Sequence, residues 1–94
     1  MSVALAAMAA LARALARSLA PLHIRVNAVS PGSTATAMTA EYDDEALHKV
    51  AERTLIGRIG DAREIAAVAQ FLISDAASYM TGEVVHVNEG SYLG

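Results

Sequence analysis

The sequence predicts an α/β fold made of two short parallel strands and three to four helices. Two short runs rich in β-branched residues are separated by a long stretch with helical patterns. Strands joined by so long a crossover lie parallel, with a right-handed connection. Because two strands cannot form a stable parallel sheet by themselves, we expect the rest of the sheet to come from elsewhere.

Composition supports one small globular unit, so we expect residues 1–94 to form a single partial domain. The chain is 54% hydrophobic and 18% charged, and it has no cysteine, which excludes disulfides and thiolate chemistry and fits a reducing compartment. Its net charge is −3, with three arginines and no acid in residues 1–40, and four basic and ten acidic residues in residues 41–94. This balance argues against a nucleic-acid surface.

The first predicted element is a helix over residues 2–20. Leu11, Leu15 and Leu19 follow one another at a spacing of four, and nine alanines make the stretch a strong helix former suited to close packing. Pro21 ends it.

Three other interpretations of this opening stretch were weighed. A secretory signal places its positive charges before the apolar run, and here Arg13 and Arg17 follow it. A transmembrane helix needs about 20 apolar residues, and Arg13 interrupts the run. A mitochondrial transit peptide is also arginine-bearing and acid-poor, and stays open as a minor alternative, although the pattern continues through Pro21 into a strand.

The next elements are a strand over residues 24–29, bounded by Pro21 and by Pro31–Gly32, and a loop of small and hydroxyl residues. A helix is then expected within residues 41–53, with three carboxylates in its first turn that complement the positive end of the helix dipole. A turn at residues 57–60 follows.

Asp61 and Glu64 have the spacing of a capping box and start a helix over residues 62–74. The buried face of this helix is predicted to consist of Ile65, Val68, Ala69 and Leu72. A second strand over residues 83–88 ends before Gly90.

Two long stretches carry a family resemblance. They read ALARALARSLAPLHIRVNAVSPGSTATAM and RIGDAREIAAVAQFLISDAASYMTGEVVHVNEG. Together they resemble the C-terminal part of the short-chain dehydrogenase/reductase family, which are NAD(P)-dependent oxidoreductases acting on CH–OH groups. The resemblance implies a partial Rossmann-like fold, in which the two strands are the last two of a doubly wound parallel sheet. It also implies that residues 2–20 form the helix of the active-site motif and of a dimer interface, and that residues 37–56 form a substrate-covering lid.

The resemblance assigns cofactor contacts to the loop after the first strand. Pro31 and Gly32 match the pair that turns the backbone under the nicotinamide ring, where a residue without Cβ allows close approach. Thr34 matches the residue that pairs with the carboxamide, and Thr36 the threonine that contacts the pyrophosphate. Met38 matches a position at the border of the substrate pocket.

The catalytic pair of the family is missing. These enzymes move a proton through a Tyr hydroxyl whose pKa is lowered by a Lys four residues later. An ungapped count places Met1 and Leu5 at those two positions, and neither side chain can do that work. The sequence also contains no glycine-rich phosphate-binding turn, and Asn88-Glu89-Gly90 replaces the Asp-Gly-Gly common in the family.

Two hypotheses about function follow. The first is a truncated piece of an NAD(P)-dependent short-chain dehydrogenase/reductase, inactive by itself. The alternative is a non-catalytic oligomerisation module that docks onto itself or onto intact family members. Either way we expect a cytoplasmic oligomer that uses a small-molecule substrate at most, with no nucleic-acid or membrane partner. His23, His48 and His86 have no second ligand at helical spacing, so no metal site is expected.

Overall fold

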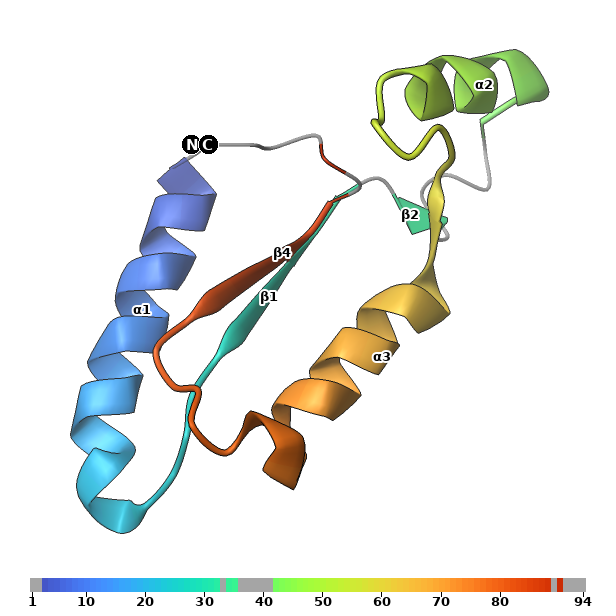
Figure 1. Cartoon of the computed structure of the whole chain (residues 1–94). Coiled ribbons are helices and arrows are strands. Elements are labelled where there is room, and N and C mark those ends of the chain that lie inside the picture. The colour runs from blue at the N-terminus through green and yellow to red at the C-terminus, as the bar shows by residue number, and fades with distance from the viewer. Residues whose placement is uncertain (1–2, 33, 36–41, 89, 91–94) are drawn as a thin grey trace.

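The computed structural model describes residues 3–32, 34–35, 42–88 and 90. In chain order the elements are α1 (Val3–Leu19), η1 (Ala20–Leu22), β1 (Ala28–Pro31), β2 (Thr34–Ala35), α2 (Asp44–Glu52), β3 (Gly60–Asp61), α3 (Ala62–Leu72), η3 (Asp75–Ala77) and β4 (Val84–Val87). Strands β1 and β4 pair in parallel, and α1 and α3 lie on opposite sides of them (Figure 1). The predicted α/β class and the parallel pairing across a long crossover are confirmed.

Helix α1 confirms the predicted helix almost residue for residue, and its alanine face packs on the sheet. The buried residues are Ala9, Ala12 and Ala16, whereas Leu11 and Leu15 are 59% and 40% exposed. Small side chains let the helix axis approach the strands closely. At Gly82 a Cβ would lie only 3.6 Å from the Cβ of Ala16, which shows how near α1 comes to the turn before β4.

Strand β1 begins later than predicted. Residues 24–27 are not in a strand, and the strand instead includes Ser30 and Pro31. The reason is that the backbone at Val26 bonds to a turn: its N–H donates to Thr81 Oγ1 at 3.1 Å, and its carbonyl accepts from Gly82 N–H at 2.7 Å. Pro31 is tolerated because it is the last residue of the strand.

Asn27 holds the start of β1 to the start of β4. Its Nδ2 donates to the Met80 carbonyl at 3.1 Å, and its Oδ1 accepts from Glu83 N–H at 3.1 Å. Arg25 donates to the carbonyls of Met80 and Ser74 at 3.2 and 3.3 Å. The side chains of Arg25 and Asn27, in the predicted strand, therefore form hydrogen bonds with backbone N–H and carbonyl groups of the chain that leads into β4.

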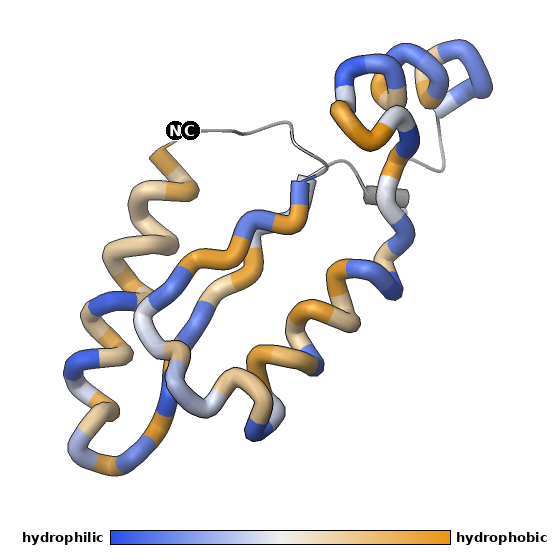
Figure 2. The backbone as a smooth tube through the Cα atoms, in the orientation of Figure 1, coloured by the Kyte–Doolittle hydropathy of each residue, from blue (hydrophilic) through white to orange (hydrophobic). Residues whose placement is uncertain are grey.

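Helix α2 is shorter than the predicted segment and contains no buried residue. Asp43 is its N-cap rather than part of its first turn, with Oδ1 accepting from Ala46 N–H at 2.8 Å. Asp44 and Glu45 occupy the first turn, as predicted. Most of α2 is hydrophilic (Figure 2).

Helix α3 begins with the predicted capping box. Asp61 accepts from Arg63 N–H at 2.8 Å, and Glu64 accepts from Asp61 N–H at 2.9 Å. Leu72 is buried, as predicted, but Ala69 is exposed, so that part of the predicted buried face is wrong. Within the described residues α3 contacts β1, η3 and β3, and these contacts leave Ala69 exposed.

Two short strands were not predicted. Strands β2 and β3 pair in parallel, with Thr34 opposite Gly60 and Ala35 opposite Asp61. The pairing places the residues that follow β1 beside the residues that precede α3 (Figure 1).

One helical stretch within the described residues, Val3–Leu22, is long and apolar enough to cross a membrane by length and composition. The central helix of a globular fold meets the same criterion, and three alanines of α1 pack against the sheet. Taken alone, this property is weak support for a membrane segment.

Candidate functional site

The carboxyl ends of β1 and β4 form the edge at which parallel sheets bind ligands. Pro31 lies opposite Val87 at this edge, and Gly32 N–H donates to the Val87 carbonyl at 2.9 Å. Gly90 has φ +83°, and its N–H donates to Asn88 Oδ1 at 3.2 Å. The predicted cofactor residues Pro31 and Gly32 therefore stand at the end of the sheet with their backbone fixed to β4.

The amino-terminal end of α1 lies at the same end of the molecule, because α1 runs opposite to the strands (Figure 1). Leu5 lies there and lines a cavity of about 280 Å³ with Ala6, Ala9, Arg13, Val84 and His86. Met1, the other residue at a catalytic position, lies outside the described residues. Leu5 thus presents an isobutyl group where the family resemblance expects an ammonium group.

Thr34 continues from this edge into β2, where it pairs with Gly60. Thr36 and Met38 lie outside the described residues. The structure therefore places Pro31 and Gly32 at the carboxyl end of the sheet, whereas Leu5 lies near Val84 and His86 of β4.

A buried hydroxyl organises the turn after α2. Thr54 is 8% exposed, and its Oγ1 donates to the Ala51 carbonyl and accepts from Gly57 N–H, both at 2.8 Å. Gly57 has φ +87°, a conformation that favours glycine. The next residue, Leu55, lies against the end of β4, since a Cβ on Gly90 would be 2.6 Å from its Cδ1.

An ion pair joins this turn to α3. Arg58 donates through Nη1 and Nη2 to the two carboxylate oxygens of Glu64, at 2.7 and 2.8 Å. The hydrogen bonds from Arg58 and from Asp61 N–H lower the pKa of Glu64 to about 2, and the same carboxylate raises the pKa of Arg58. The backbone N–H of Arg63 lowers the pKa of Asp61. All these carboxylates stay ionised near neutral pH.

The sequence analysis missed Thr54, Arg58 and Asn27 as organising residues. Arg58 gave no sequence signal, because its separation of six residues from Glu64 follows no helical spacing. Thr54 gave none either, since a lone threonine after a polar helix resembles any helix end.

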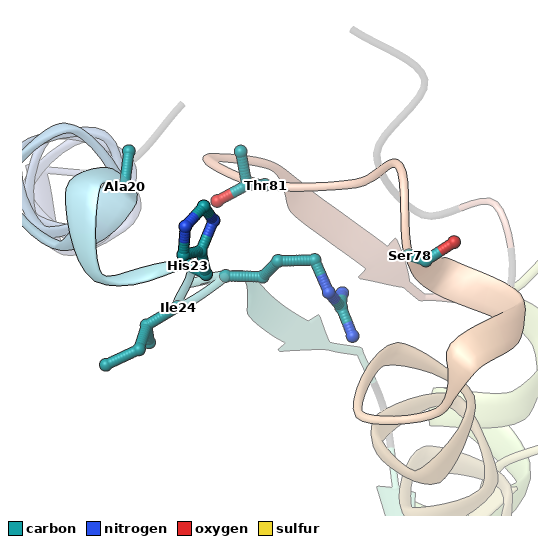
Figure 3. Close-up of a pocket in the computed structure, with 6 residues that line it drawn as sticks. Ala20, His23, Ile24, Ser78 and Thr81 are labelled. Atoms are coloured by element: carbon teal, nitrogen blue, oxygen red, sulfur yellow. The ribbon is translucent and has the colours of Figure 1, made fainter.

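A larger cavity, of about 360 Å³, lies at the other end of β1 (Figure 3). The His23 ring and the Thr81 hydroxyl point into it, and His23 adopts a left-handed conformation at φ 59°. Ala20, Ile24, Arg25 and Ser78 complete its lining. This cavity is remote from Pro31 and Gly32, so it belongs to the fold's opposite end and not to the predicted cofactor site.

No group of three or more metal-ligating side chains occurs within the residues that the structure describes. His48 pairs with Glu52 one turn away on α2, at 2.9 Å, and both side chains are largely exposed.

The sequence and fold match known oxidoreductases. A family model described as enoyl-(acyl carrier protein) reductase matches residues 1–92. The 3-oxoacyl-(acyl-carrier-protein) reductase FabG of Aquifex aeolicus is 48% identical over 80 residues, covering 85% of this chain and 32% of that protein. FabG of Escherichia coli K12 is 40% identical over 92 residues, covering 98% of this chain and 38% of that protein.

A solved structure shares the fold. A short-chain dehydrogenase/reductase from Brucella melitensis has 45% sequence identity and a TM-score of 0.85, over 95% of this chain and 36% of that one. The chain therefore spans about a third of the length of the relatives it matches. These matches are to oxidoreductases and do not favour the alternative of a non-catalytic docking module. The family match over almost the whole chain, with the shared fold, shows that this protein belongs to the short-chain dehydrogenase/reductase family.

Proposed function

We propose that residues 1–94 form the nicotinamide end and the substrate lid of an NAD(P)-dependent short-chain dehydrogenase/reductase fold, without its proton-transfer pair. In this proposal the whole unit is a single partial domain, and residues 37–56 are the lid. The reaction class is hydride transfer between nicotinamide and a carbonyl or alcohol. The chain by itself does not catalyse it.

One observation carries the proposal. Pro31 and Gly32 lie at the carboxyl ends of β1 and β4, and the amino-terminal end of α1 lies toward the same end of the molecule (Figure 1). In parallel sheets this edge is where dinucleotides bind. The hydrogen bond from Gly32 to Val87 holds the loop at that edge.

The residues present fit the nicotinamide half of the cofactor. Gly32 has no Cβ, so a flat ring can approach its backbone, and Thr34 and Thr36 would supply backbone and hydroxyl groups to the carboxamide and the pyrophosphate. NAD or NADP, when bound, supplies or accepts the hydride. The adenosine half has no counterpart here, because the sequence has no glycine-rich phosphate-binding turn.

Proton transfer is the step that this chain's residues do not support. A thioether at Met1 has no exchangeable proton, and Leu5 can neither lower a neighbouring pKa nor bind a ribose hydroxyl. Met38 is proposed to border the substrate pocket. We also propose that the chain forms an oligomer, with copies of itself or with related subunits, and that it is located in the cytoplasm.

The test is an amide NMR titration of the 94-residue chain with NADH and NADPH, each up to millimolar concentration. We expect shifts confined to residues 31–36, with an affinity no tighter than about millimolar because the phosphate-binding turn is missing. Gly32→Val should abolish these shifts, and Ala14→Val, on the exposed side of α1, should leave them unchanged. Micromolar binding, or shifts absent from residues 31–36, would contradict the proposal.

A further inference from the structure

The segment between β2 and β3 contains α2, in which no residue is fully buried and an apolar face is half-buried. The contacts His48–Glu52 and Lys49–Glu45 run along the exposed surface of α2 itself. Exposed pairs of this kind contribute little to stability. The position of α2 must therefore be set by the chain on either side of it.

The two ends of this segment are fastened side by side. Ala35, which precedes it, pairs with Asp61, and Thr34 pairs with Gly60, which follows it. The pairing is only two residues long, and a ladder this short is weak by itself. A second interaction is needed to hold the base of the segment closed.

Glu64 provides that interaction. Both of its carboxylate oxygens are used, by Arg58 Nη1 and Nη2 at 2.7 and 2.8 Å, and Oε1 also accepts from Asp61 N–H at 2.9 Å. The side chains of Arg58 and Glu64 are also about half exposed, at 55% and 45%, but their pair is bidentate, which fixes orientation as well as distance and sets it apart from the single contacts on α2. It therefore ties the end of the segment at Arg58 to the first turn of α3, and α3 is anchored to the body by buried Leu72.

We propose that Arg58, Glu64 and the backbone of Asp61 form a clasp that positions the lid helix α2 and the cofactor loop relative to each other. The clasp acts through geometry, because it touches neither cofactor nor substrate. Glu64 and Arg58 are thus positioning residues. Their role in covering a substrate rests on the proposed function, whereas their effect on α2 does not require it.

The position of α2 depends both on the clasp and on the turn between α2 and Arg58. Thr54 closes the turn between α2 and Arg58, and Leu55 rests on Gly90 at the end of β4. If the clasp opens, the described contacts that still hold this segment are those of Thr54 and Leu55 and the two-residue pairing of β2 with β3. We therefore expect opening to free α2 and residues 57–61 while β1, β4 and α1 stay intact.

The experiment is hydrogen–deuterium exchange of the 94-residue chain, without cofactor. Glu64→Gln removes the ionic bond to Arg58, while the glutamine oxygen can still accept from Asp61 N–H and keep the capping box. We expect amides in residues 44–61 to exchange about tenfold faster, with α1, β1 and β4 unchanged. Glu45→Gln, which breaks an exposed ion pair on α2 itself, is the matched control and should change nothing.

A double-mutant cycle separates a clasp from general destabilisation. Arg58→Met and Glu64→Gln each remove the ion pair but leave a side-chain oxygen at residue 64 to accept from Asp61 N–H, so the double variant should lose little more protection than either single variant. Faster exchange throughout the chain, or unchanged exchange in residues 44–61, would overturn the proposal. Because no cofactor is present, this result is independent of whether NADH or NADPH binds at residues 31–36.

Discussion

The body of the molecule and the segment that carries α2 are stabilised in different ways. The body, made of α1, β1, α3 and β4, joins residues more than fifty positions apart through backbone pairing and through Asn27 and Arg25. The α2 segment is held mainly by interactions between residues three to six positions apart, such as Thr54 with Gly57 and Arg58 with Glu64. Local interactions of this type can open without disturbing the body.

The largest effect is expected in the body, at the contact of α1 with the sheet. Ala12 is 4% exposed, so Ala12→Leu forces extra methyl and methylene groups between α1 and the strands. We expect a loss of about 1–3 kcal/mol in the free energy of unfolding, measured by thermal and urea melts followed by circular dichroism. Ala14→Leu adds the same atoms on the exposed side of α1 and should change stability by no more than about 0.5 kcal/mol.

A smaller and local effect is expected at Thr54. Thr54→Val keeps the shape but leaves the Gly57 N–H without the hydroxyl that accepts from it, at a cost of about 1 kcal/mol to the local opening free energy. The measurement is exchange of the amides in residues 50–58, with β4 as the internal reference. Ser74→Ala removes a hydroxyl that bonds to Phe71 at an exposed helix end and should have a much smaller effect. If Thr54→Val reduced the exchange protection of β4 as much as that of residues 50–58, the body and the α2 segment would not be stabilised separately.

The smallest effect is a pH dependence confined to the base of the segment. Glu64 has its pKa lowered to about 2 by Arg58 and by Asp61 N–H, so its stabilising effect is complete above its ordinary pKa of 4.5. The stabilisation by Glu64 is lost as the pH falls from 4.5 through about 2. The pKa of Asp61 is also lowered, by the backbone N–H of Arg63, so protonation of Asp61 destabilises the base of the segment in the same direction. The side-chain carboxyl shift of Glu64, followed by NMR, should report the transition of Glu64, and Glu64→Gln should remove this signal while the transition of Asp61 remains. A transition centred near 4.5 would contradict the geometry of the pair.

Elements with strong local signals were predicted well. The alanine-rich stretch with its terminal proline gave α1, and the capping-box spacing gave the start of α3. Strand β1 was misplaced because β-branched residues at 24–26 mark extended chain without saying what it pairs with. The leucine stripe of α1 was conspicuous in sequence, yet the alanines pack on the sheet, since close approach to the strands selects small side chains.

The candidate site was predictable only in part. Pro31 and Gly32 were assigned from the family resemblance, and they lie at the carboxyl ends of β1 and β4, while their contact with a cofactor stays a prediction. The β2–β3 pairing and the Arg58–Glu64 bond were not predictable, because a two-residue ladder leaves no period in the sequence and an ion pair six positions apart follows no helical spacing.

The side-by-side pairing of Thr34–Ala35 with Gly60–Asp61 has a consequence for variation in this part of the fold. When the two ends of a connection are already held together, its length changes the entropy of loop closure only slowly. Insertions, deletions or whole exchanges between these strands are therefore tolerated by the rest of the domain. The same pairing makes the stretch between β2 and β3 a unit that can be exchanged without moving β1 and β4.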